Sequence, residues 1–465
     1  MFIPALLLPH QNLDPVAKYF LVRFVLRFGI VAPVQCGVKE LAKMIGVSDR
    51  LVTKSLADLV GHGLLSHQAV SEGRGRPKSE YRCTPSFVAT LREFSSSLSS
   101  PQKTVIAHLL ERAALGDGRG RAWSGAAAVA VFQDKMTPGE RLANLRARKK
   151  SDRLSDTNRL LLAVLLTRAD RFGVVSDFGS SELRKTTGLS QERLRCGISR
   201  LLDLGLIRIY VPGATSQFFF DKITSVYFLN LQHPEISDGS NVTLALAYKL
   251  ERPLDSMQNV SSIYQEVCAF NQSPKQFAGT QSGRLLGFFK KQRLEFFCLL
   301  QHVLMKYVAH LLSKYWSGLP LTPSNNRIDF PELRELIRRD FRLPQMSLVG
   351  HADRYAILVD ELYGRALESA ISIKSVLFSA LEVSLESMDF VFIPQPVDSA
   401  YCRFTLLALP QSPAEWCGCK AILEEATGRH VETFSCEADI PLEDQYRFGL
   451  RAKPSPKRGG RAEPL

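Results

Sequence analysis

Hydrophobic and polar residues follow the same order in two separate stretches of the chain. Each stretch reads Glu-Leu, Gly-aliphatic-Ser, aliphatic residues four, eight and eleven positions after that Ser, and then Gly-Leu-aliphatic. The first repeat has this pattern at Glu40, Leu41, Gly46, Val47, Ser48, Val52, Leu56, Leu59, Gly63, Leu64 and Leu65. The second repeat has it 142 residues later, at Glu182, Leu183, Gly188, Leu189, Ser190, Leu194, Ile198, Leu201, Gly205, Leu206 and Ile207. Identical spacing indicates an internal duplication.

The pattern predicts two helices joined by a tight turn in each repeat. Gly46 and Gly188 suit the turn, and the hydroxyls of Ser48 and Ser190 suit the N-cap of the second helix. Gly63 and Gly205 are expected to end that helix, because a positive φ costs glycine little. A hairpin should follow each helix, from 64–71 and 79–84 in the first repeat and from 206–211 and 217–220 in the second.

The exposed face of each second helix carries candidate DNA-reading residues. If Val52, Leu56 and Leu59 are buried, a 100° step places Arg50, Lys54 and Ala57 opposite them and Thr53 at the edge. The corresponding surface of the second repeat is polar, and Glu192 within it can either accept from a cytosine amino group or repel phosphate. The candidates on the two helices are Ser48, Arg50, Thr53, Lys54, Ser190, Gln191, Arg193, Arg195 and Ser199.

The loop of the first hairpin is basic. Gly73-Arg74-Gly75-Arg76-Pro77-Lys78 places three cations among glycines, which permits close approach to phosphates or insertion into a narrow minor groove. Arg74, Arg76 and Lys78 are therefore further DNA-binding candidates. A solvated turn can have the same composition. The position of this loop, between the two strands of the first predicted hairpin, favours the DNA-binding interpretation.

Helix, turn, helix and hairpin, preceded by an apolar helix, is the element order of a winged helix-turn-helix domain. The first repeat, with its Ser-x3-Val-x3-Leu-x2-Leu-x3-Gly-Leu-Leu line and Gly73–Lys78 loop, resembles the bacterial winged-helix regulators of the MarR superfamily. The resemblance covers about 15–95 and 155–232, and it implies a DNA-binding module in each repeat. The second repeat departs from it, since its short hairpin tip has no Arg or Lys.

Charge and composition favour a soluble partner of nucleic acid. The 465 residues carry 59 Lys+Arg against 46 Asp+Glu, a net charge of +13, and such an excess attracts polyanions. Nine scattered cysteines suit a reducing cytoplasm. Pro4 and Pro9 interrupt the apolar N-terminus, which makes it a poor signal peptide, and no apolar run reaches membrane-spanning length.

The rest of the chain is expected to form several regions. We predict a mainly α protein with small β wings: winged-helix domains at 1–95 and 155–232, and a basic flexible linker at 96–154 that includes the cationic stretch 141–153. A helical domain at 250–390 should contain long helices at 284–316 and about 352–388. A small α/β unit at 391–450 should read strand 401–409, helix 413–427 and strand 429–436. A disordered basic tail should occupy 451–465.

Enzyme and cofactor motifs are lacking in the sequence. There is no His-Glu-x-x-His, no Gly-x-Ser-x-Gly and no nucleotide-binding glycine loop. Cys417 and Cys419 have Cys-x-Cys spacing, which is less usual for zinc than Cys-x2-Cys. With Cys402 and Cys436 nearby, they are more typical of unpaired thiols than of a zinc site. We therefore expect no catalytic site, no metal and no cofactor.

The sequence thus predicts a cytoplasmic, bacterial-type protein that binds double-stranded DNA sequence-specifically and regulates transcription. Replication initiation on a plasmid or other mobile element is an alternative use of tandem winged helices. A scaffold whose winged helices bind protein is an alternative of a different class. Homo-oligomerisation through the C-terminal helices is also possible on this pattern, and no membrane association is expected.

Overall fold

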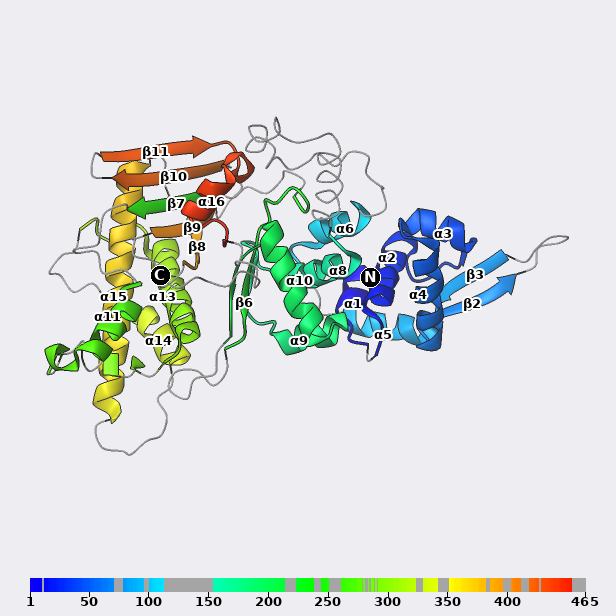
Figure 1. Cartoon of the computed structure of the whole chain (residues 1–465), viewed down its shortest axis with the longest axis horizontal. Helices are drawn as coiled ribbons and strands as arrows, with labels where there is room; N and C mark the ends of the chain where they lie inside the picture. Colours follow the sequence, from blue (N-terminus) through cyan, green and yellow to red (C-terminus); the bar gives the residue numbers. More distant parts are fainter. Residues whose placement is uncertain are drawn as a thin grey trace, which may run out of the picture. The chain divides into compact units, whose positions relative to one another are not determined.

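The computed structural model describes residues 1–10, 12–70, 78–95, 100–112, 154–213, 223–237, 244–250, 261–277, most of 279–322, 329–341, 351–381, 385–395, 403–410, 418–425 and 428–453. Two compact units make up the chain (Figure 1). The N-terminal unit is Met1–Ile207 with Leu229–Asp238, and the C-terminal unit is Arg208–Phe228 with Gly239–Leu465. The structure is mainly helical, with three small sheets in the described residues.

The first repeat has the predicted order of elements. A short helix α1 (Phe2–Leu7) and the apolar helix α2 (Pro15–Phe28) precede strand β1 (Val34–Gln35) and helices α3 (Val38–Ile45) and α4 (Asp49–Gly61). The predicted hairpin follows as β2 (Leu65–Val70) and β3 (Lys78–Cys83), and α5 (Pro85–Ser95) comes next. β3 lies between β1 and β2, antiparallel to both.

The second repeat begins in the same way. Helix α8 (Asp156–Arg168) and strand β4 (Val174–Val175) precede α9 (Ser180–Thr187), α10 (Gln191–Leu204) and β5 (Ile207–Val211). The strand bonded to β5 is β6 (Val226–Leu229), in the order β4-β6-β5. The predicted partner strand at 217–220 lies outside the described residues.

Glycine produces the turn in both repeats. Gly46 ends α3 with φ 73°, and Gly188 ends α9 with φ 72°, a left-handed conformation in which a Cβ is unfavourable. The predicted glycines after α4 and α10 also have positive φ, 68° at Gly63 and 77° at Gly205. The local backbone of the repeat was therefore read correctly from the sequence.

The two repeats are not joined only by a flexible linker. Helix α6 (Lys103–Arg112) lies within the expected linker at 96–154 and packs against α8, with Ile106, Leu109 and Leu110 fully buried. The apolar helices α2 and α8 also pack against each other. This burial makes the repeats parts of one compact unit. The remainder of the expected linker, 113–153, lies outside the described residues.

The C-terminal unit contains a five-stranded sheet. Its strands are β7 (Leu244–Leu250), β8 (Met388–Ile393), β9 (Arg403–Pro410), β10 (Gly418–Glu425) and β11 (Gly428–Phe434), in the order β11-β10-β7-β9-β8. β7 and β10 are parallel, and the other neighbours are antiparallel. The helices are α11 (Ser261–Gln272), α13 (Leu294–Tyr315), α14 (Pro331–Asp340), α15 (His351–Ala380) and α16 (Leu442–Arg447).

Several boundaries predicted for this half are wrong. The helix expected at 413–427 is replaced by strand β10, in which Cys419, Ala421 and Ile422 are buried; a short apolar run of this kind fits a central strand as well as a helix. The helix expected to reach Met388 ends at Ala380, and Met388 begins β8. The division at 390 also fails, because strand β8 (Met388–Ile393) runs across it and pairs with β9 of the same sheet.

Contrary to the expectation that no apolar run reaches membrane-spanning length, α13 is long and apolar enough to cross a membrane, and it is the one such helix among the described residues. Of its most apolar window, 67% is buried inside the protein. The helix packs against β8 and α15, which accounts for its apolar side chains as core residues.

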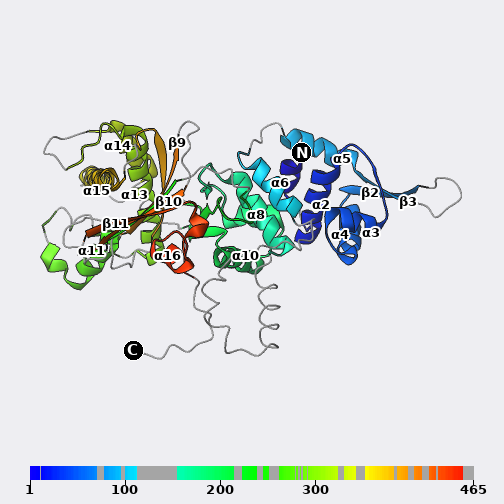
Figure 2. The ribbon, with the colours of Figure 1, turned by 90° about the horizontal axis from the view of Figure 1, so that it is seen from above.

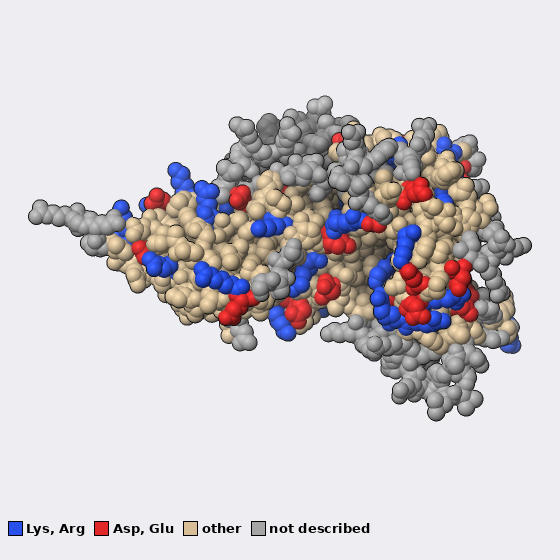
Figure 3. Space-filling model, turned by 180° about the vertical axis from the view of Figure 1, so that it is seen from behind, with Lys and Arg blue, Asp and Glu red and all other residues tan. Residues whose placement is uncertain are grey.

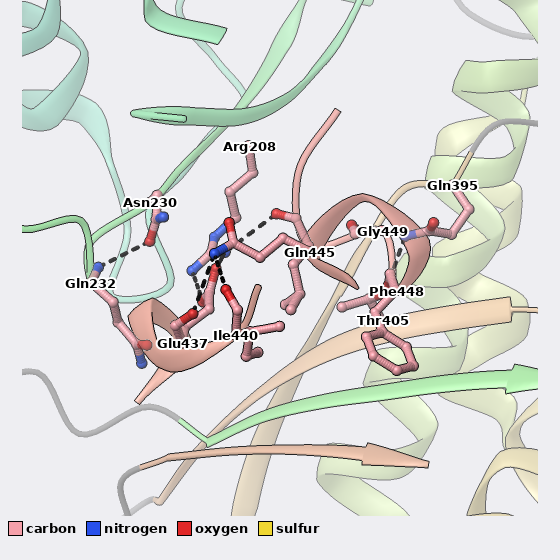
Figure 4. A network of polar contacts seen from close by, with 11 residues as sticks. Arg208, Asn230, Gln232, Gln395, Thr405, Glu437, Ile440, Gln445, Phe448 and Gly449 are labelled. Atoms are coloured by element: carbon pink, nitrogen blue, oxygen red, sulfur yellow. Dashed lines mark hydrogen bonds and ion pairs between the residues drawn. The ribbon is translucent and has the colours of Figure 1, made fainter. Parts of the chain in front are cut away.

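The chain end is folded as far as Arg451, contrary to the disordered tail expected from that residue onward. Arg208 forms a buried ion pair with Glu437 and also donates to Leu450 O (3.4 Å). Ala452 N donates to Arg208 O (3.0 Å), and Arg451 is 9% exposed. Gln395 Nε2 donates to the carbonyl oxygen of Gly449, and Thr405 Oγ1 donates to that of Phe448 (Figure 4). Residues 454–465 lie outside the described residues.

Candidate nucleic-acid interface

Helix α4 presents the predicted face to solvent. Val52, Leu56 and Leu59 are buried with exposed fractions of 0–7%, whereas Arg50, Thr53, Lys54 and Ala57 are exposed. The turn at Gly46 sets α4 against α3, so that the face opposite the core carries the polar residues. The periodicity of the sequence located this face correctly.

Two of the candidate hydroxyls in the first repeat have structural partners. Ser48 Oγ accepts from Leu51 N (3.4 Å) as the N-cap of α4, and its own hydroxyl hydrogen remains able to donate to a phosphate. Thr53 Oγ1 donates to Asp49 O (3.0 Å) and has no second hydrogen to give. Thr53 can therefore contact a base only as an acceptor or through its methyl group.

Lys54 is held by a carboxylate that does not belong to its own helix. Its Nζ lies 2.7 Å from Oδ2 of Asp14, the N-cap residue of α2. The side chain of Lys54 is 73% exposed and that of Asp14 is 27% exposed. Partial burial of Asp14 acts to raise its pKa, but hydrogen bonds from Lys54 and Val16 N and the charges of Lys54 and Arg193 hold the pKa below its usual value.

The effect of Arg193 on Asp14 relates the first repeat to the second. Arg193 belongs to α10, so Asp14 lies within electrostatic reach of a cation from each of the two predicted reading helices. Figure 2 shows α3, α4 and α10 along one side of the N-terminal unit, with α5 and α6 on the other. Helices α4 and α10, which carry the described candidate residues of the two repeats, thus lie on one side of one compact unit.

Helix α10 also has the predicted polar face. Leu194, Ile198 and Leu201 are buried. Ser190 Oγ accepts from Arg193 N (3.3 Å) as the N-cap, in the same role as Ser48. The other DNA-binding candidates on this helix are all exposed: Gln191, Arg193, Arg195 and Ser199. Glu192 is exposed as well.

Gly197 explains how α10 is seated on the repeat's apolar helix. A Cβ at Gly197 would lie 2.9 Å from Leu161 Cδ2 of α8 and 3.2 Å from Asn158 Oδ1. The missing side chain therefore lets the two helices approach closely, with the polar face of α10 turned outward. Sequence periodicity places Gly197 on the inner face but does not indicate this close packing.

The hairpin of the first repeat is only partly described. Lys78 begins β3, opposite Val70 of β2, and is exposed. Arg74 and Arg76 lie outside the described residues, as does the tip of the second hairpin. Their DNA-binding roles stay predictions.

Lys18 joins the two repeats in a way the sequence did not indicate. It lies in the apolar helix α2, is 2% exposed, and donates from Nζ to Leu8 O (2.8 Å) and to Thr186 O in α9. Burial lowers the pKa of Lys18 to about 7. Asp14, in contrast, had a readable signal, because Asp followed by Pro is a typical helix start.

The described residues hold no group of three or more His, Cys, Asp or Glu side chains placed to bind a metal ion. Of the four C-terminal cysteines, Cys419 is buried and Cys436 is exposed. Cys402 and Cys417 lie outside the described residues. Burial raises the pKa of the Cys419 thiol above its usual range, which disfavours the thiolate that metal binding needs.

Several described cations of the C-terminal unit are paired with carboxylates. In the C-terminal unit Arg334 bonds to Asp329 (3.0 Å) and also to Asp360, and Arg338 bonds to Glu335 (2.7 Å). Figure 3 shows such interleaved blue and red side chains. Interleaved charges of this kind produce little net field for a polyanion.

Comparison with known proteins gives no independent assignment. No protein-family model matches the chain, and no curated protein is significantly similar to it.

Proposed function

We propose that the protein binds double-stranded DNA sequence-specifically and regulates transcription, with α4 and α10 as its two recognition helices. The observation that carries the proposal is that both helices follow a left-handed glycine turn, begin at a serine N-cap and expose cations: Arg50 and Lys54 on α4, and Arg193 and Arg195 on α10. A helix of this kind fits the major groove, where arginine can read guanine.

Packing of the repeats favours one mode of binding. Helices α2 and α8 share a core, and Asp14 lies near cations of both recognition helices. Helices α4 and α10 therefore act as one preorganised surface and not as two independently moving modules. A preorganised surface loses less conformational entropy on binding than two independent modules do. We therefore expect one contiguous DNA site for each chain.

Selection from random-sequence duplexes tests the proposal. The intact chain should enrich a defined sequence. The Arg50→Ala and Lys54→Ala variants should relax preference at particular base pairs, and a variant with both Arg74→Ala and Arg76→Ala should weaken all duplexes more evenly. Lys43→Ala, an exposed cation on α3, is the matched control and should keep the preference.

Absence of enrichment with the intact chain would contradict the proposal and favour the protein-binding scaffold. Mapping of the bound sites in the genome then separates the biological uses. Promoter-proximal sites support transcriptional regulation, whereas clustered direct repeats support replication initiation.

A further inference from the structure

Strand β11 is the outermost strand of the C-terminal sheet. Seven residue pairs join it to β10, from Cys419 opposite Phe434 to Glu425 opposite Gly428. Among the described residues no strand pairs with its other edge. A regular edge of this length presents backbone N–H and C=O groups that can pair with another strand.

The exposed side chains of β11 include an apolar residue in the centre. Residues Gly428–Thr433 are all exposed, and Val431 is 41% exposed. Arg429 bonds to Ser379 of α15, and Val431 lies on the same face of the strand as Arg429 because it is two residues further on. Phe378, next to Ser379, is 62% exposed.

We propose that β11 pairs antiparallel with β11 of a second copy of this chain, about a two-fold axis at Val431. In that register Val431 lies opposite the partner's Val431. His430 lies opposite the partner's Glu432, and Glu432 opposite the partner's His430. The imidazole N–H of each histidine donates to the facing carboxylate. The strand is therefore complementary to itself, which is the requirement of an isologous interface.

Charge selects this register over its neighbours. An axis at Glu432 places two carboxylates opposite each other, and like charges destabilise a cross-strand pair. An axis at His430 places two imidazoles opposite each other, so that neither N–H faces a carboxylate. The Val431 axis alone, among these three, gives two favourable polar pairs and one apolar pair.

The second copy also pairs with the edge of the sheet that has no strand partner among the described residues. Pairing joins two five-stranded sheets into one continuous sheet and covers the backbone groups of this edge. This interface differs from the oligomer through the C-terminal helices that the sequence predicts, which stays a prediction. It does not depend on DNA binding.

Sedimentation equilibrium of the full-length chain, without DNA, tests the interface. Wild type should be a dimer. His430→Glu places two pairs of carboxylates across the interface and should raise the dimer dissociation constant roughly tenfold or more. Glu432→Lys should weaken the dimer as well. The double variant with both substitutions restores unlike pairs and should regain most of the affinity.

Glu443→Lys on α16 is the matched control for Glu432→Lys, because it makes the same charge change at an exposed residue outside β11. It should leave the dimer unchanged. Far-UV circular dichroism checks that every variant is folded. A wild-type chain that stays monomeric at high micromolar concentration overturns the proposal. A dimer that is insensitive to His430→Glu also overturns it.

Discussion

Lys54 Nζ of α4 lies 2.7 Å from Asp14 Oδ2 at the start of α2. The cation that the proposed function needs at the DNA surface is therefore partly neutralised within the free protein. A phosphate that approaches Lys54 must compete with this carboxylate. Asp14 thus sets both the position of the Lys54 side chain and its availability.

Replacement of Asp14 by asparagine should tighten DNA binding. Asparagine keeps the N-cap of α2, because its side-chain oxygen still accepts from Val16 N, while the negative charge near Lys54 and Arg193 is lost. A partly exposed ion pair contributes about 0.5–1 kcal/mol, so we expect roughly a two- to fivefold gain in affinity, measured by fluorescence anisotropy on the selected duplex. Glu93→Gln on α5, which lies on the other side of the unit in Figure 2, should change affinity little. Unchanged or weaker binding by a stable Asp14→Asn protein would contradict the assignment of this surface.

Gly188 should be more sensitive to substitution than Gly63, although both have positive φ. At Gly63, φ is 68° and nothing lies within 4 Å of an added Cβ, so alanine should cost only the backbone strain, about 1 kcal/mol. At Gly188, φ is 72° and the added Cβ would also lie 2.8 Å from Leu13 O of the first repeat. Gly188→Ala should therefore lose about 1–3 kcal/mol more in the free energy of unfolding. Urea denaturation measures both, and equal losses would argue against tight packing of the two repeats.

Lys18 predicts a pH dependence of stability. Burial lowers its pKa from 10.5 to about 7, so between pH 7 and about 10.5 the unfolded chain binds more protons at this site than the folded chain. The contribution of Lys18 to the free energy of unfolding therefore rises with pH between pH 7 and about 10.5 and is constant below pH 7. His10 beside it has its pKa lowered to about 4 by burial and by the charges of Lys18 and His62, so it stays neutral throughout the window.

The comparison with Lys18→Met isolates this contribution, because other groups that titrate in the same range are present in both proteins. The free energy of unfolding of wild type minus that of the variant should increase by about 1–2 kcal/mol from pH 7 to pH 8.5. Urea denaturation at the two pH values provides the measurement. A difference that stays constant or falls would show that Lys18 is charged in the folded protein.

The repeat was predictable because its information is local. Spacing alone located the buried residues Val52 and Leu194 and the turn glycines Gly46 and Gly188, since helix periodicity and a left-handed glycine need only neighbouring residues. The exposed face with Arg50 and Arg195 followed from the same periodicity. The exposure of the candidate residues was therefore predictable on both helices, whereas their contacts with DNA stay predictions.

Contacts between distant segments were not predictable in this way. Lys18 lies among apolar residues of α2, and its partner Thr186 is 168 residues away; nothing in the local pattern indicates a lysine that bonds to another repeat's carbonyl. β10 was expected to be a helix because a short apolar run does not distinguish the two structures, and its parallel pairing with β7 depends on a strand that lies far earlier in the chain.

The salt dependence of duplex binding tests the central claim most directly. Each phosphate neutralised by a protein cation contributes about −0.9 to the slope of log affinity against log salt concentration. A variant with Arg50→Ala, Lys54→Ala, Arg193→Ala and Arg195→Ala should therefore have a slope about two to four units shallower than wild type on the selected duplex. A control variant that removes four exposed cations of the C-terminal unit, Lys275, Lys306, Arg338 and Arg339, should keep the wild-type slope. A steep wild-type slope that the four substitutions on α4 and α10 flatten is the predicted result; a flat wild-type slope, or a steep one that these substitutions leave unchanged, would contradict DNA binding by these two helices.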